Sequence, residues 1–153
     1  MNALQHKIAS TLAEEHGAVR ATMRAIELEL ARPRSHPAEV ERVRDLMEEI
    51  RAFRHCLQRH FRPEQAGDLL SVMGVVDAAT IRLAEQILVQ HESIEGRLLG
   101  ILSELGQLGE AGCALTERSK QEIRSLFAQL ARHEHLENDL YRRVVEPGPT
   151  PES

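Results

Sequence analysis

The chain has 153 residues, a formal net charge of −5 at pH 7 and eight histidines, but only two cysteines, three phenylalanines and one tyrosine. This length suits a single domain, and the negative charge gives no electrostatic reason to expect nucleic acid or an anionic membrane as a partner. No apolar run is long enough to cross a bilayer. The first residues lack a signal-peptide pattern, and Cys56 and Cys113 lie far apart, which is typical of reduced thiols in a cytoplasmic protein.

Helix-breaking residues divide the chain into four long segments that we expect to be helical. In chain order these helices span about residues 2–31, 35–62, 77–105 and 116–145. Pro37 lies in the first turn of the second helix, a glycine-containing connector at residues 106–112 follows the third, and Pro147 follows the fourth. The pattern predicts an all-α fold, an up-down-up-down four-helix bundle over residues 1–146, with a disordered tail at residues 147–153.

Each expected helix carries one apolar stripe at spacings of three and four residues, which is typical of a helix face in the core of a bundle. A histidine interrupts every stripe, and in the last three helices a glutamate follows that histidine after four residues. The stripes are Ala9, Leu12, His16, Val19, Met23, Ile26 and Leu30; Val43, Leu46, Ile50, Phe53, Leu57, His60 and Glu64; Ile81, Ala84, Leu88, His91, Glu95, Leu98, Leu102 and Leu105; and Ile123, Leu126, Leu130, His133, Glu137, Leu140 and Val144.

The members of each His/Glu pair are one helical turn apart on the same face, so both are expected to point into the interior. Glutamate is almost never fully buried unless it is paired or binds a metal, and several uncompensated charges would exceed a domain's stability of about 5–15 kcal/mol. Cations held by imidazole and carboxylate would neutralise them. The sequence therefore predicts a di-metal site formed by His16, His60, Glu64, His91, Glu95, His133 and Glu137.

This ordered set of motifs resembles the hemerythrin-like cation-binding domains of the bacterial type. The resemblance rests on His16, on HFRPE at residues 60–64, on HESIE at 91–95 and on HEHLE at 133–137, and it spans nearly the whole chain. It implies two iron ions joined by an oxo or hydroxo bridge. The ligand roles it implies are His16 and His60 as terminal ligands of one iron, His91, Glu95 and His133 as ligands of the other, and Glu64 and Glu137 as bridges.

Two positions differ from the hemerythrins that carry oxygen. Those proteins have histidine where this chain has Glu95, and aspartate five residues after the last histidine, where this chain has Glu137 after four. Both differences resemble relatives that sense iron or repair iron centres. An anionic ligand at Glu95 would favour ferric iron and lower the reduction potential, so reversible oxygen carriage ranks below redox chemistry or sensing.

We expect the site to bind or sense dioxygen, nitric oxide or peroxide, or iron itself, because one coordination position stays open if Glu95 binds through a single oxygen. Two alternatives are a redox enzyme that consumes peroxide or acts as an oxidase, and an iron store or donor for repair. Whether the protein is an enzyme therefore stays open. Manganese and zinc also stay open, since His/Glu ligation tolerates several first-row metals.

Residues beside the stripes have simpler expected roles. Pro63 lies between His60 and Glu64, where it removes a helix hydrogen bond and crowds the carbonyl of Arg59, so we expect a kink or local unwinding there. Glu134 lies next to the last stripe, where it could support a histidine ligand. The four remaining histidines, His6, His36, His55 and His135, are expected to be exposed to solvent.

Overall fold

The structure is a computed structural model that describes residues 3–33, 39–65 and 77–145. Within these ranges the side chains at positions 4, 5, 8, 9, 62–65, 144 and 145 are not described. The predicted tail at residues 147–153 and His36 therefore lie outside the described residues. Of the other histidines expected on the surface, His6, His55 and His135 are exposed.

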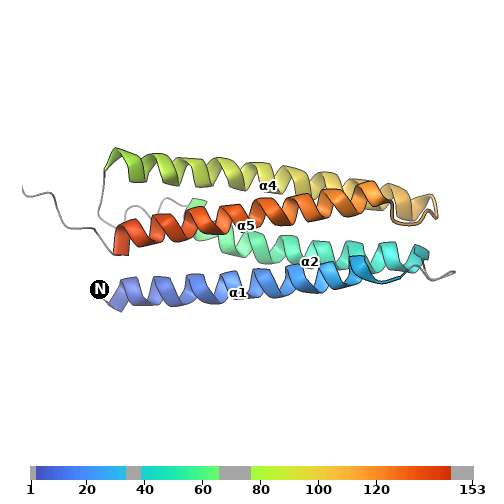
Figure 1. Ribbon diagram of the computed structural model, residues 1–153, viewed down its shortest axis with the longest axis horizontal. Helices are drawn as coiled ribbons and strands as arrows, with labels where there is room; N and C mark the ends of the chain where they lie inside the picture. The colour runs from blue at the N-terminus through green and yellow to red at the C-terminus, as the bar shows by residue number, and fades with distance from the viewer. Residues whose placement is uncertain (1–2, 34–38, 66–76, 146–153) are drawn as a thin grey trace, which may run out of the picture.

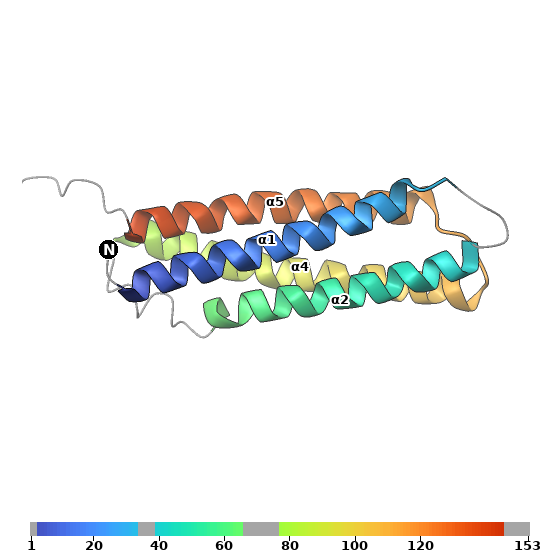
Figure 2. The ribbon, with the colours of Figure 1, turned by 90° about the horizontal axis from the view of Figure 1, so that it is seen from below.

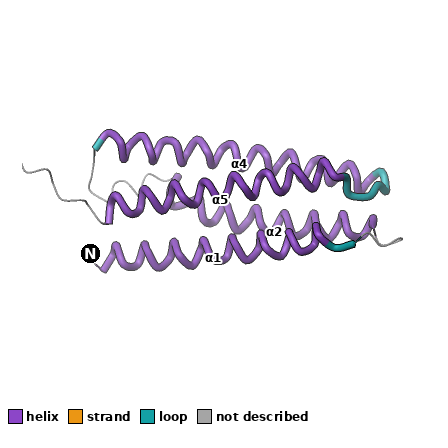
Figure 3. The backbone as a smooth tube through the Cα atoms, in the orientation of Figure 1, coloured by secondary structure: helices purple, strands orange, loops and turns teal. Residues whose placement is uncertain are grey.

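The described chain is all-helical and contains no strand, which confirms the predicted fold class at this level. Helix α1 packs against α2 and α5, and α4 packs against the same two helices. All four lie lengthwise side by side (Figures 1 and 2), and the described loops are at the helix ends (Figure 3). Among the described residues, no helix has both the length and the apolarity needed to cross a bilayer. The helices are α1 (Ala3–Ala31), α2 (Glu39–Gln65), α4 (Ala78–Glu110) and α5 (Glu117–Val145).

Short polar side chains fix where α4 and α5 begin. The Asp77 carboxylate accepts a hydrogen bond of 2.8 Å from the backbone N–H of Thr80. The Thr116 hydroxyl accepts one of 3.0 Å from the backbone N–H of Ser119. The first N–H groups of a helix have no partner within the helix, so these bonds stabilise the N-terminus of α4 and that of α5. Both lie where the sequence predicts the helices to start.

Helix α4 continues beyond its predicted end to Glu110, passing through Gly106 and Gly109. A Cβ atom added at Gly106 would lie 3.8 Å from Cε of Met47 on α2, an ordinary packing distance. Packing against α2 offsets the helix-weakening effect of the two glycines. The turn comes only at Gly112, whose φ of 65° lies in the left-handed region that glycine adopts without strain.

Two apolar clusters pack on either side of a polar layer. The larger cluster joins all four helices and contains residues such as Ile26, Phe53 and Leu98, each at most 1% exposed. The smaller one consists of the buried residues Ala84, Ile87 and Leu140. The stripe histidines and Glu137 occupy the layer between them, which is what positions the candidate site.

The predicted stripes of the first, second and fourth helices are buried or half-buried wherever their side chains are described. On α4 the prediction is partly wrong, because Ile81 and Leu88 are 41% and 37% exposed. The buried face of α4 instead contains Ile87, Ile94 and Ile101. The predicted stripe and the observed buried face have every seventh residue in common, namely Ala84, His91, Leu98 and Leu105. They differ in the residues between these positions, and α4 has apolar side chains in both sets.

Candidate metal centre

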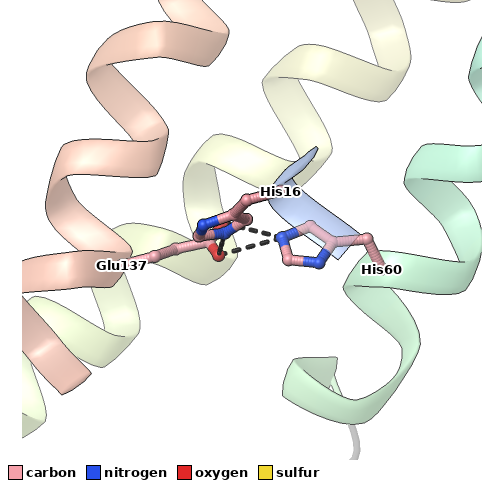
Figure 4. A group of neighbouring side chains, drawn as sticks. All are labelled: His16, His60 and Glu137. Atoms are coloured by element: carbon pink, nitrogen blue, oxygen red, sulfur yellow. Dashed lines mark hydrogen bonds and ion pairs between the residues drawn. The ribbon is translucent and has the colours of Figure 1, made fainter. Parts of the chain in front are cut away.

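Glu137 on α5 is 3% exposed and lies at the centre of three imidazole rings. Its Oε2 atom is 2.8 Å from Nε2 of His16 on α1 and 2.9 Å from Nε2 of His60 on α2. Its Oε1 atom is 2.5 Å from Nε2 of His133, one turn earlier on α5. Figure 4 shows His16 and His60 directed at this carboxylate from their two helices. One buried anion therefore contacts histidines from three helices.

His91 on α4 completes the cluster from the opposite side. Its Nε2 atom lies 3.0 Å from Nε2 of His133, and the residue is only 1% exposed. The ring of Phe61 stacks on its imidazole, with ring centroids 3.8 Å apart and an interplanar angle of 12°. Burial, helped by the nearby His133 ring, lowers the pKa of His91 to about 3. His91 is therefore neutral at ordinary pH, the form in which imidazole binds metals.

The charge of Glu137 is stabilised by its neighbours. Burial alone would raise the pKa of its carboxyl group. Hydrogen bonds from His133, His16 and His60 outweigh that effect and hold the pKa well below its usual range. Glu137 is therefore a carboxylate, the form in which it can bind a cation.

The five residues form two groups of three ligands that share Glu137. In each group one ligand atom per residue lies within 4.8 Å of the others, and every member is buried. The structure thus brings together five of the seven predicted ligands. We call the groups the first triad, His16, His60 and Glu137, and the second triad, His91, His133 and Glu137.

The other two predicted ligands are not seen in either triad. Glu64 lies in α2, which continues through Pro63 to Gln65, but its side chain is outside the described part of the chain, so its bridging role stays a prediction. Glu95 on α4 is half-buried. Its Oε1 atom accepts a hydrogen bond of 2.7 Å from Nε of Arg54 on α2 and forms an ion pair of 2.5 Å with Nη2 of the same residue. Its role as a ligand also stays a prediction. Of the three stripe glutamates, the described side chains show one, Glu137, to be fully buried.

The donor set fits metal cations. His60 lies between two carboxylates, with Nδ1 2.8 Å from Glu15 and Nε2 facing Glu137. His133 similarly has Nδ1 2.8 Å from Oε1 of Gln90 and Nε2 facing Glu137. In both rings Nδ1 faces an oxygen acceptor and Nε2 faces the carboxylate that the two triads share. A metal ion bound at Nε2 would replace one proton and leave the Nδ1–H bond intact.

The outer contacts of the histidines were only partly predictable. Glu134, predicted as possible support, lies 3.6 Å from Nδ1 of His16 and also forms a 2.8 Å ion pair with Arg20. Glu15 and Gln90 were missed. Each immediately precedes a stripe histidine on its own helix but contacts a histidine on the neighbouring helix. Spacing along a single helix could not have identified either contact, because each one joins two different helices.

A cavity of about 100 Å³ lies beside the first triad, between α1, α2 and α5. Its wall includes His16, His60 and Glu137 together with apolar side chains such as Val19 and Leu57. The cavity is large enough for a small molecule, since a water molecule occupies about 30 Å³ in the liquid. A ligand in it would touch the triad directly.

Comparisons of the chain with models of known families, with curated proteins and with solved structures find no match. The resemblance to hemerythrin-like domains therefore rests on the motifs in the sequence. The structure adds a buried His/Glu cluster within an all-helical fold that could hold metal. This cluster is the basis of the functional proposal.

Proposed function

We propose that this chain is a hemerythrin-like, up-down-up-down four-helix bundle that holds two iron ions and binds or senses a small ligand such as dioxygen, nitric oxide or peroxide. The observation that carries the proposal is the pair of buried triads that share Glu137. Bundle cores hold di-iron or di-manganese centres in this way, with histidines and carboxylates from facing helices.

In this proposal each triad would hold one ion, and Glu137 would contribute to both positions. Glu64, one turn after His60, is proposed as a second bridge. When bound, a pair of such ions supplies Lewis acidity and one-electron redox chemistry to a small ligand. Apolar clusters lie on both sides of the layer, and every residue of the two triads is buried. Low water content strengthens the attraction between Glu137 and a cation.

The cavity beside the first triad favours ligand binding over simple iron storage. An iron store requires ligands and a path for the ion, whereas a ligand-binding protein also requires space next to the metal. About 100 Å³ of such space adjoins His16 and His60. Small molecules of two or three atoms fit within this volume.

The contact between Glu95 and Arg54 bears on whether reversible oxygen carriage ranks below redox chemistry or sensing. The argument against reversible oxygen carriage depended on Glu95 adding negative charge to one iron. Because Arg54 pairs with this carboxylate at 2.5–2.7 Å, that charge is neutralised outside both triads. The argument therefore applies only if the ion pair opens when metal binds.

Metal analysis of protein purified without added metal tests the proposal. We expect about two irons per chain and charge-transfer absorption in the near ultraviolet. The double variant His91→Leu/His133→Leu should lose this iron, whereas the control His55→Leu/His135→Leu, which changes two exposed histidines, should keep it. A wild-type chain that binds no transition metal even after loading would contradict the proposal.

Turnover separates ligand binding from catalysis. Loss of peroxide at a rate well above that of free iron would assign the iron-loaded chain to the redox enzymes. Stable binding of nitric oxide without turnover would assign it to the binding or sensing proteins. The same His91→Leu/His133→Leu variant serves as the control in both assays.

A further inference from the structure

The two triads differ in what supports their histidines from outside. In the first triad, Nδ1 of His60 lies 2.8 Å from a carboxylate oxygen of Glu15. Nδ1 of His16 lies 3.6 Å from a second carboxylate, that of Glu134. Glu134 shares its charge with Arg20 at 2.8 Å, so Glu15 is the main anionic support. The first triad therefore has an anionic environment.

Two described contacts of the second triad are with neutral side chains. Nδ1 of His133 donates to the amide oxygen of Gln90 at 2.8 Å. The ring of His91 stacks on Phe61. The stripe carboxylate of Glu95 is held by Arg54 and is in neither triad. Gln90 and Phe61 thus orient the two rings without adding negative charge.

This difference should affect how tightly each triad binds a cation. A carboxylate hydrogen-bonded to the outer nitrogen of a histidine makes the inner nitrogen a stronger donor, and its charge also attracts the metal. An amide fixes the orientation of the ring but contributes no charge. Changes in such outer partners alter metal affinity by about 10- to 100-fold.

We propose that Glu15 and Gln90 are positioning residues that make the two metal positions unequal, so that the first triad fills before the second. The inference rests on the proposed function, because it requires two metal positions. It adds an order of loading and names the residues that set it. An amide at position 15 and a carboxylate at position 90 should narrow or reverse the difference in metal affinity between the two triads.

Titration of the metal-free, full-length chain with Co²⁺ tests this order, with binding followed by calorimetry and visible absorption. We expect two steps of one equivalent each, separated by about 10- to 100-fold in affinity. Glu15→Gln should weaken the first step by about 10- to 100-fold and leave the second nearly unchanged. Glu14→Gln, at the exposed neighbouring position, is the matched control.

The reciprocal variant adds a carboxylate to the second triad. Gln90→Glu should tighten the second step by about 10-fold or more, whereas Gln86→Glu, one turn earlier and exposed, should not. A purely structural role of Glu15 would instead lower the unfolding temperature of the metal-free chain and weaken both steps together. The step-specific change therefore distinguishes a positioning role from a folding role.

Three results would overturn the inference while leaving a di-metal centre in place. The wild-type chain could bind two equivalents with one affinity, Glu15→Gln could behave like Glu14→Gln, or Glu15→Gln could weaken both steps equally. A wild-type chain that binds no Co²⁺ would overturn the proposed function itself, and the inference with it.

Discussion

The large apolar cluster and the polar layer are equally buried but are stabilised by different physics. Ile26 and Phe53 in the cluster are 0% exposed, and a buried side chain of this kind stabilises the fold by about 1.5–3 kcal/mol. His91 and Glu137 in the layer are 1% and 3% exposed, yet burying such groups costs free energy unless they are paired or bind a cation. The stability of the cluster therefore depends on packing, and that of the layer on what it binds.

The largest expected effect is on metal binding, through Glu137. Glu137→Gln keeps the shape of the side chain but removes the negative charge of the residue that belongs to both described triads. We expect affinity for metal to fall at both positions by more than the roughly 100-fold that losing an outer partner causes. Metal content after loading measures this, and Asp139→Asn, at an exposed position two residues later, is the control. Retention of both ions by Glu137→Gln would show that the layer is not built around this carboxylate.

Substitution in the apolar cluster should instead lower the free energy of unfolding and leave metal binding intact. Leu126 is 1% exposed, so Leu126→Ala should lower the free energy of unfolding by about 2–5 kcal/mol while the folded chain keeps its metal. Leu28 is 67% exposed, and Leu28→Ala should change stability by less than about 0.5 kcal/mol. Urea denaturation combined with metal analysis checks both quantities. Loss of metal from folded Leu126→Ala would mean that the two regions are not independent.

The stability of the metal-free chain should depend on pH through the layer. The pKa of His91 falls from 6.5 to about 3 on folding, so between these values the unfolded chain binds a proton that the folded chain does not. This lowers stability as pH falls, by up to about 1.4 kcal/mol per pH unit. The pKa of Glu137 is also lowered, so its stabilising contribution is complete above the ordinary carboxyl value of 4.5 and is lost as pH falls below it.

His91→Leu isolates the first of these effects. Between pH 6.5 and 4.5 the stability of metal-free His91→Leu should fall less steeply than that of the wild type, whereas exposed-site His135→Leu should follow the wild type. Urea denaturation at several pH values provides the comparison. Equal slopes for wild type and His91→Leu would show that His91 is not kept neutral by the fold.

The smallest expected effect concerns Glu95. The side chains of Arg54 and Glu95 are 33% and 32% exposed, so their ion pair should contribute only about 0.2–1 kcal/mol. Glu95→Gln should therefore reduce the free energy of unfolding slightly and leave metal content unchanged. Glu92→Gln, at an exposed position, is the control and should also keep its metal. Loss of one metal equivalent in Glu95→Gln alone would establish Glu95 as the ligand that the sequence predicts.

The sequence predicts the all-helical fold class, and it predicts which residues are buried wherever a helix has a single apolar stripe. On α2 and α5 one stripe is available, and His60, His133 and Glu137 lie on it and are buried. On α4 two neighbouring stripes share His91, and the choice between them decides whether Glu95 or Ile94 faces the core. Periodicity could not make that choice, because packing against α2 and α5 sets the rotation of α4 about its axis.

Contacts between helices could not be predicted from one helix at a time. The bonds from Glu15 to His60 and from Gln90 to His133 join different helices, so they depend on the rotation and height of both partners. The spacing of residues along one helix contains neither quantity. The cavity beside the first triad depends on three helices and is equally invisible in the sequence.

Anomalous diffraction from crystals of the iron-loaded chain tests the metal centre most directly. Two iron peaks should lie in the polar layer, one next to Nε2 of His16 and His60 and the other next to Nε2 of His91 and His133, with the Glu137 carboxylate between them. A layer without an iron peak, in a chain whose four histidines keep the contacts seen here, would contradict a di-metal function for this protein.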